Sequence, residues 1–492
     1  MSQIMLIGIS GLDADLLRVY GPSLPNLRRL MLESPFLELG STIPPEPVPS
    51  WASVYTGLNP ANHGMLAKMD CLERSIPELQ LFQEEPFWEK AARAGKRVCV
   101  LNPLLAPTHE IKGLLLVPST PWPADGEPIP PDAFPSLLND EPLIPTASHL
   151  ATFCDTLQAR TKQQVSVALA IFAREPWDLF FVQLDALDHV QHFLWRYSDP
   201  GDPLYPGKNE HANRILEFYR LFDGIVGRFR AALSEEGILG VVSSHGHERR
   251  CIYRLHINEW LREQGFLTPL SPAKTLFGCH SFAAQERDQP EWLDKSGLGT
   301  LSTWLAQRLP WNNNRSSARQ SVDQCSTVAQ MVELASATSS YGGIRINREL
   351  LEREGRDYEL VCEAIITGLE GLCIKESPVV NWVKKRERCY QGKQLEIYPD
   401  ILFELRSDFG IGRNLYTPLL VSDSTHRLVS GAHSSHGVFL LENWPAELET
   451  YEDFQPPLVM DVAPTLLRLL NVACSSLDGQ ALVHLHPLRQ LI

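Results

Sequence analysis

Aspartate and histidine residues at short, regular spacings are the first sign of chemistry in this sequence. Asp188 and His192 stand four positions apart in "LDHVQHFLWRY", so on a helix both side chains lie on one face and can bind one metal ion. Two further pairs of histidines stand in turn-like segments, His245 and His247 in "SSHGHERR" and His433 and His436 in "SGAHSSHGVF". Two imidazoles and one carboxylate with an open coordination position suit Zn²⁺, which acts as a Lewis acid or activates water. Taken singly, each of these residues could also be an ordinary surface or capping residue.

The segments that must position these residues alternate between strand and helix patterns. Nearly continuous apolar runs at 3–10, 178–185 and 237–244 are typical of central parallel strands that are covered on both faces. Helical patterns at 24–34 and 211–237 lie between such runs. The alternation predicts an α/β fold, a doubly wound and mostly parallel central sheet with helices on both faces.

Ligands of such sheets gather at the carboxyl ends of the strands. Asp13, Asp188 and His245 each follow a predicted strand, so we expect them to converge on one edge of the sheet. The pattern changes at 268–340, which is rich in Ser, Asn and Gln and weakly periodic. We predict an inserted cap or excursion there, near the active-site side, with the core formed by 1–267 and 341–492.

Composition limits the classes of partner. The chain has 492 residues, 44% of them hydrophobic and 21% charged, which is typical of a folded protein. A net charge of −15 argues against a nucleic-acid binder, whereas an anionic small molecule remains compatible because a bound metal can dominate the local field. No run of apolar residues is long enough for a membrane span, and the N-terminus does not resemble a signal peptide. Ten cysteines without paired spacing favour reduced thiols and a cytoplasmic location. A homodimer is compatible with the sequence, which is otherwise silent on oligomeric state.

Several motifs in a fixed order carry a family resemblance. They are "GISGLDADLL", "STIPP", "PSWASVYTGLNPANHG", "LDHVQHFLWRY", "VVSSHG", "YGGIRINREL", "YPDILFEL", "GAHSSHG" and "DVAPTLLRLLNV". In their order and spacing the chain resembles the alkaline phosphatase superfamily, specifically its type I phosphodiesterase/nucleotide pyrophosphatase-like branch. The resemblance covers nearly the whole chain except 268–340. It implies a centre of two metal ions and a Thr or Ser nucleophile that is transiently phosphorylated.

The resemblance also implies which residues bind metal. Asp188, His192 and His433 match the ligands of one ion, and Asp13 and His245 match two ligands of the other. We therefore expect one complete zinc site.

The second site departs from the family pattern at two positions. The nucleophile falls on Pro47, and the aspartate that should precede His245 is Ser244. Proline has no hydroxyl group, so a phosphorylated intermediate cannot form at position 47. We expect the second metal site to be weak or vacant. Ser50 and Ser53 lie nearby as alternative nucleophiles, although Ser53 matches a structural serine of the family.

Other residues receive roles on the same grounds. Asp13 and His245, if freed from metal binding, are candidates for general acid and base catalysis. Glu46, beside the lost nucleophile, could replace a ligand, act as a base or be a solvated loop residue. Candidates for substrate binding are Arg196, His247 and His436.

Three hypotheses about function follow. The first is a metal-dependent enzyme with non-phosphoenzyme chemistry, either hydrolysis or group transfer or cyclisation, acting on a small phosphorylated or otherwise anionic metabolite. The second is an inactive pseudoenzyme that serves as a binding module, and the third is a phosphodiesterase or nucleotide pyrophosphatase with a displaced serine nucleophile. The sequence does not name the substrate.

Overall fold

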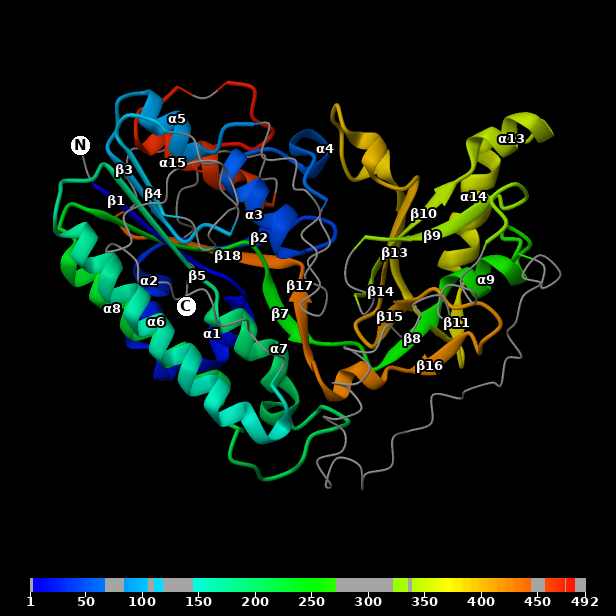
Figure 1. Ribbon diagram of the computed structural model, residues 1–492, viewed down its shortest axis with the longest axis horizontal. Helices are drawn as coiled ribbons and strands as arrows, with labels where there is room; N and C mark the ends of the chain where they lie inside the picture. The colour runs from blue at the N-terminus through cyan, green and yellow to red at the C-terminus, as the bar shows by residue number, and fades with distance from the viewer. Residues whose placement is uncertain are drawn as a thin grey trace, which may run out of the picture.

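A computed structural model describes residues 3–66, 84–104, 110–117, 145–270, 322–334, 339–443, 456–473 and 475–482. In these ranges the chain builds two halves, each around its own sheet (Figure 1). The larger sheet has seven strands in the order β2-β18-β6-β1-β5-β3-β4. Their bounds are Phe36–Gly40 (β2), His436–Leu441 (β18), Ile238–Ser243 (β6), Ile4–Ile9 (β1), Leu179–Leu184 (β5), Val98–Leu101 (β3) and Leu114–Val117 (β4).

The pairing within this sheet is mostly parallel. Strands β6, β1, β5, β3 and β4 are joined by parallel ladders, and β18 runs antiparallel to both of its neighbours. Three of these strands, β1, β5 and β6, are the three apolar runs of the sequence, and they lie side by side at the centre of the sheet. The predicted α/β fold with a mostly parallel sheet is therefore confirmed.

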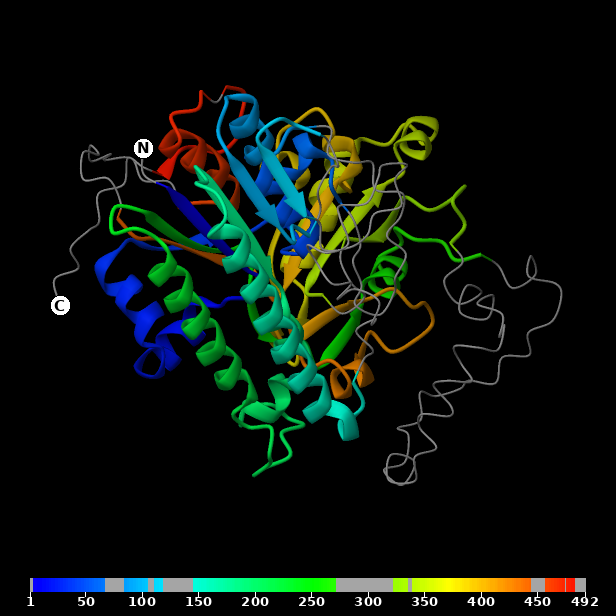
Figure 2. The same cartoon turned by 60° about the vertical axis from the view of Figure 1, so that its left-hand side comes forward.

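Helices cover both faces of the sheet, as the strand composition requires (Figure 2). In β1, Met5, Ile7 and Ile9 belong to one apolar cluster, while Ile4 and Leu6 belong to another on the opposite face. The helices of the first cluster are α1 (Ala14–Tyr20), α2 (Pro25–Glu33), α6 (Leu150–Phe172), α7 (Ala186–Ser198) and α8 (Arg214–Ala232). Those of the second are α3 (Pro47–Thr56), α5 (Phe87–Arg93) and α15 (Val462–Leu469). Because successive side chains of a strand point to opposite faces, a strand that is apolar throughout has to be covered on both.

The second half contains a four-stranded antiparallel sheet in the order β13-β14-β10-β9. Its strands are Val380–Lys385 (β13), Ile401–Leu405 (β14), Tyr341–Ile346 (β10) and Ala329–Glu333 (β9). It shares an apolar cluster with α9 (Ile257–Glu263), α13 (Arg348–Glu354) and α14 (Tyr358–Glu370). A smaller sheet, β15-β8-β16, joins the same cluster through Phe409–Gly412 (β15), Tyr253–His256 (β8) and Leu420–Ser422 (β16). This half therefore has a core of its own.

A two-stranded antiparallel ribbon lies between the two halves (Figure 1). It consists of β7 (Gly246–Arg249) and β17 (Gly431–Ser434). Both strands lead away from the carboxyl-end side of the large sheet, β7 directly after β6 and β17 directly before β18.

The predicted excursion at 268–340 lies largely outside the described residues. Of that range the structure describes 268–270, 322–334 and 339–340. Strand β9 falls within it and pairs with β10. The division of the chain at 268 and 340 stays a prediction.

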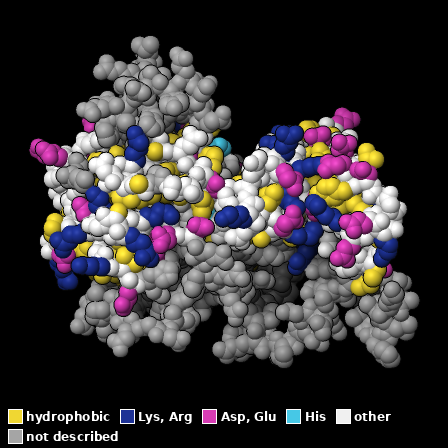
Figure 3. Space-filling model, turned by 90° about the horizontal axis from the view of Figure 1, so that it is seen from above, with side chains coloured by type: hydrophobic (Ala, Val, Ile, Leu, Met, Phe, Trp, Pro, Cys, Tyr) yellow, Lys and Arg dark blue, Asp and Glu magenta, His cyan; other side chains and the backbone are white. Residues whose placement is uncertain are grey.

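Surface and composition bear on the expected partners. Figure 3 shows acidic and basic side chains interspersed over both halves of the viewed face, without the basic patch that a phosphate backbone would require. Among the described helices, none has both the length and the apolar stretch needed to cross a bilayer. The cysteines of the described part are free thiols. The cytoplasmic location stays a prediction.

A buried histidine, His63, joins α3 (Pro47–Thr56) to the short helix that follows it. Ser53 in α3 has its Oγ 3.0 Å from Nε2 of His63, at the end of α4 (Pro60–His63). Nδ1 of His63 accepts a hydrogen bond from the backbone N–H of Met65, so Nε2 carries the proton that is donated to Ser53. Burial lowers the pKa of His63 to about 3, so the imidazole is neutral in the folded protein at ordinary pH.

This histidine predicts a pH dependence of stability. Below its unfolded pKa near 6.5, the unfolded chain binds a proton at His63 that the folded chain does not, so the free energy of unfolding falls as the pH drops. At pH 5 the loss relative to pH 8 is about 2 kcal/mol from this group. We expect His63→Gln to have a smaller loss of unfolding free energy between pH 8 and pH 5 than the wild type, measured by urea denaturation at both values. Equal losses in the two proteins would contradict the assignment.

Candidate metal centre

Four elements bring acid and imidazole side chains to one place at the carboxyl edge of the large sheet. Helix α7 begins directly after β5 and carries Asp188 and His192. His245 follows β6, and the ribbon carries His247 in β7 and His433 in β17. The candidates predicted from separate motifs thus meet in space.

His192 has a defined proton position. Its Nδ1 lies 3.0 Å from the backbone carbonyl oxygen of Gly431, and because a carbonyl oxygen only accepts, Nδ1 carries the proton and donates. The lone pair of Nε2 then faces Asp188 Oδ2 at 3.5 Å and Nε2 of His433 at 3.0 Å. A ring whose far nitrogen donates to a backbone carbonyl while the near one is free is the usual arrangement of a metal-binding histidine.

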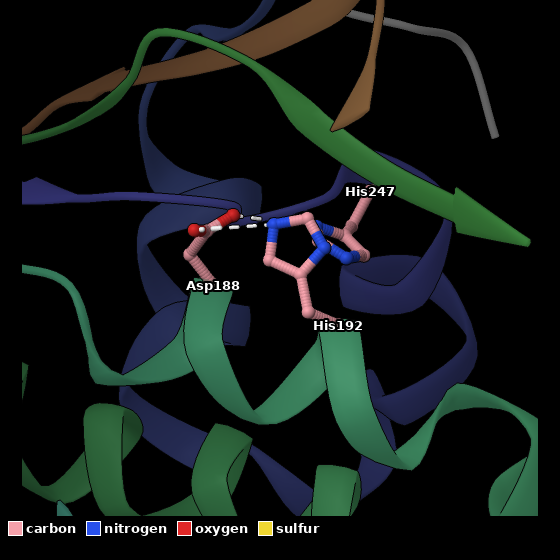
Figure 4. A group of neighbouring side chains, drawn as sticks. All are labelled: Asp188, His192 and His247. Atoms are coloured by element: carbon pink, nitrogen blue, oxygen red, sulfur yellow. Dashed lines mark ion pairs between the residues drawn. The ribbon is translucent and has the colours of Figure 1, made fainter. Parts of the chain in front are cut away.

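The ribbon supplies two more imidazoles on one face. His247 and His433 are directly paired in the antiparallel register, so their side chains project to the same side. Nε2 of His433 lies 3.4 Å and Nδ1 of His247 lies 3.5 Å from Oδ1 of Asp188. Nε2 of His245 reaches the same oxygen at 3.4 Å. Figure 4 shows Asp188 and His192 projecting from α7 toward His247.

These side chains form two sets that could hold a metal ion. One set is Asp188, His192 and His247, and the other is Asp188, His245 and His433, each with its donor atoms within 4.8 Å of one another. All five side chains are largely buried. Imidazole nitrogens with a carboxylate oxygen are donors that suit zinc and other divalent transition metals.

The electrostatics of the cluster favour the presence of a cation. Burial opposes ionisation of Asp188, but His192 and His433 outweigh it and hold the pKa of that carboxyl well below its usual range. For His433, burial opposes protonation, and the carboxylates of Asp188 and Glu46 raise its pKa nevertheless. Burial and the neighbouring imidazoles lower the pKa of His245 and of His247. The carboxylates therefore require one positive charge in the cluster, which a proton on His433 or a metal ion can supply.

His245 is oriented by a chain of hydroxyl groups. Ser50 Oγ is 2.7 Å from the carbonyl oxygen of Glu46 and 2.9 Å from Ser244 Oγ, which is 2.9 Å from Nδ1 of His245. Two oxygens 2.7 Å apart need a proton between them, and the carbonyl has none, so the proton of Ser50 lies there. Ser50 is also the donor toward Ser244 Oγ, and Ser244 Oγ shares a proton with Nδ1 of His245. The ring is thereby held with Nε2 toward Asp188.

Glu46 and Asp13 border the cluster in different ways. Oε2 of Glu46 is 3.5 Å from Nδ1 of His433, and the side chain is buried, so it is not a solvated loop residue. Asp13 caps α1, its Oδ1 accepting from the backbone N–H groups of Asp15 and Leu16, and its Oδ2 accepts from the backbone N–H of His247. Burial raises the pKa of Asp13. In the described part of the chain, Asp13 belongs to neither of the two metal-capable sets.

Two predicted substrate-binding residues have contacts elsewhere. The guanidinium of Arg196 donates to the hydroxyl of Tyr197 and lies over its ring, and the backbone N–H of Arg196 donates to Ser430 Oγ. His436 is exposed at the start of β18, with Nδ1 3.1 Å from Ser435 Oγ. Neither has a contact with the five clustered side chains within the described residues, so their roles in substrate binding stay predictions.

The comparison with known sequences decides the family. The profile of the type I phosphodiesterase / nucleotide pyrophosphatase family matches residues 4–435. The chain belongs to this family. No curated protein sequence matches it.

Solved structures show the same fold at low identity. Phosphonoacetate hydrolase from Sinorhizobium meliloti 1021, in complex with phosphonoformate, superposes with a TM-score of 0.55 at 14% identity and 96% coverage of both chains. Murine ectonucleotide pyrophosphatase/phosphodiesterase 5 gives a TM-score of 0.51 at 14% identity and 97% coverage of both chains. The resemblance noted in the sequence is confirmed at the level of family and fold.

Two features of this family member were missed in the sequence. His247 was predicted to bind substrate, and that role stays a prediction; its place beside Asp188 and His192 was not foreseen. The spacing of His245 and His247 was visible, but the pairing of His247 with His433 across the ribbon was not. Ser244 was treated as a lost ligand, and its contact with His245 became visible only with the fold.

The hydroxyl chain generates a prediction about Ser244. Replacement Ser244→Ala removes the hydroxyl partner of Nδ1, so His245 loses the contact that holds Nε2 toward Asp188. We expect zinc affinity to fall by about 10- to 100-fold, measured by competition with a chromophoric chelator. Ser435→Ala is the matched control, because Ser435 makes the same contact with His436 outside the cluster. Equal affinities in the two variants would show that the chain does not act on the metal.

Proposed function

We propose that this family member is a metal-dependent hydrolase that cleaves a phosphate or phosphonate ester of a small anionic substrate by direct attack of water. The observation that carries the proposal is the pairing of a proline at the nucleophile position with a buried cluster of metal donors beside it. Pro47 is the first residue of α3 and has no group that could be phosphorylated. A covalent phosphoryl-enzyme intermediate therefore cannot form at this position.

The clustered side chains have complementary tasks in this proposal. Asp188, His192 and His433, with His245 beside them, would hold a divalent metal, which when bound supplies a Lewis acid and lowers the pKa of a water molecule. Glu46 is the candidate base, because its buried carboxylate lies next to position 47 and contacts His433. A carboxylate so placed can take up the proton that an attacking water loses.

The expected substrate class follows from the family and its neighbours. Structures of the related fold are known with phosphonoacetate, with phosphonoformate and with AMP, all of which are small anions. A buried cluster that demands positive charge suits such ligands in a protein whose net charge is −15. Hydrolysis is favoured over group transfer in the proposal, because water needs no second binding site.

The alternative of a displaced serine nucleophile is weaker on geometric grounds. Ser50 is fully buried, and its hydroxyl is the donor in contacts with the carbonyl oxygen of Glu46 and with Ser244 Oγ. Its oxygen would have to break both contacts to attack. Ser53 is engaged with His63 on the far part of α3.

Stereochemistry at phosphorus tests the direct attack. A chiral phosphorothioate diester hydrolysed in ¹⁸O-labelled water should give product with inverted configuration, because one displacement inverts and a phosphoenzyme route inverts twice. Retention would overturn the proposal in favour of a covalent intermediate. Ser50→Ala is expected to keep the inverting reaction, and loss of all turnover in this variant with wild-type metal content would point to serine.

Metal removal tests the dependence itself. Dialysis against a chelator should abolish hydrolysis of an aryl phosphodiester, and zinc or manganese should restore it. His192→Asn combined with His433→Asn should lower kcat/KM by at least about 100-fold and remove metal, as measured by elemental analysis. His149→Asn serves as control, since His149 is exposed and its ring contacts Thr146 and Ser148 instead of the cluster. A folded, metal-loaded wild type that hydrolyses no phosphate or phosphonate ester would support the pseudoenzyme instead.

A further inference from the structure

His247 has no role in the family-implied metal sites, yet it is the least satisfied histidine of the described structure. Both of its ring nitrogens are buried without a hydrogen-bond partner, which holds for no other histidine in the described residues. Its nearest acceptor, Oδ1 of Asp188, is 3.5 Å from Nδ1, longer than a well-formed hydrogen bond. An unpaired polar group is costly to bury, so a binding partner is expected at Nδ1 of His247.

The ring cannot turn away to find another partner. It packs edge-to-face against His192, with ring centroids 4.6 Å apart, and lies 5.7 Å from the ring of Trp195. Nε2 is seated against Gly431, where a Cβ atom would lie only 2.7 Å from it. The backbone is held as well, because the N–H of His247 donates to Asp13. The remaining nitrogen, Nδ1, is therefore fixed toward Asp188.

Four imidazoles and one carboxylate are too many donors for a single catalytic ion. Zinc in a catalytic site binds three protein ligands and keeps one position open. The cluster divides into two sets of three donors that share only Asp188. The carboxylate of Asp188 has two oxygens, of which Oδ2 faces His192 and Oδ1 faces His245, His247 and His433. A carboxylate of this kind can bridge two ions.

We propose that His247 is a metal ligand and that the cluster holds two divalent cations that share Asp188. His192 and His247 complete one site, and His245 and His433 complete the other. The second ion would thus lie nearer to α7 than the family pattern implies. It would lie away from positions 47 and 244, where this chain lacks the family's donor groups. The proposal rests on the metal dependence proposed above but assigns a different ligand set and stoichiometry.

Metal content of the purified full-length protein tests the assignment. After saturation with zinc and removal of excess, the wild type should retain about two ions per chain. His247→Phe keeps a ring in the packed position but no donor, and it should retain about one. His436→Phe, which changes an exposed histidine, is the matched control and should keep the wild-type content. Circular dichroism and thermal unfolding of each variant check that it is folded.

A spectroscopic variant addresses the ligand directly. In His247→Cys loaded with Co²⁺, a thiolate at position 247 should add a sulfur-to-cobalt charge-transfer band that the wild type lacks. Unchanged metal content in His247→Phe together with no such band would overturn the assignment.

The stoichiometry separates this inference from the proposed function. A wild type with one ion that survives in His247→Phe but is lost on replacing His192 and His433 overturns the inference alone. A wild type with one ion that is lost in His247→Phe supports His247 as a ligand and overturns the proposed second site. A folded wild type that binds no metal overturns both proposals.

Discussion

The burial of the Asp188 carboxylate is the constraint on which the rest of the site depends. A charged carboxylate removed from water is costly unless opposite charge or hydrogen-bond donors surround it. Here the compensation comes from four imidazoles, one on the same helix and three from the segment after β6 and the ribbon. Because His245 is 57 residues from Asp188 in the chain and His433 is still further away, the carboxylate couples the large sheet, α7 and the ribbon into one arrangement. Without that charge, the four imidazoles would face one another with no anionic group to stabilise their close approach.

The contacts at positions 47 and 244 show how the structure accommodates the two departures from the family pattern. At position 47 a proline is well suited to the first turn of a helix, since its missing N–H would have no partner there. At position 244 a serine stands where the family resemblance implies a charged ligand, and it belongs to the hydroxyl chain that contacts Nδ1 of His245. The substitutions therefore remove a nucleophile and an anionic donor while keeping the loop and the imidazole in place. That combination is difficult to explain if the site were merely decaying.

The sequence predicted the parts of the structure that depend on local pattern. The three apolar runs became β1, β5 and β6, and the spacing of Asp188 and His192 placed both on one face of α7. The ribbon could not be predicted in the same way. The pairing of His247 with His433 depends on the register between two segments that are 186 residues apart in the chain (433 − 247). The same holds for the second antiparallel sheet, in which β10 and β14 pair across α13 and α14. Contacts over such distances are set by packing, and one sequence alone carries little of that information.

The donor set also changes the charge that a substrate meets. In the family pattern, the second ion is held by two aspartates, a histidine and the oxygen of the nucleophile, and most of its charge is neutralised by these groups. In this chain a proline and a serine occupy two of those positions, and Asp13 is engaged by backbone N–H groups of α1 and of His247. Each anionic donor replaced by a neutral imidazole leaves one more unit of positive charge in a centre loaded with metal. A site of that kind attracts a multiply charged anion more strongly and activates water more readily, since a more positive environment favours hydroxide. In the proposed centre, the loss of the covalent nucleophile and the gain of imidazole donors would thus be two sides of one change, which would shift the chemistry from a side-chain oxygen to solvent water.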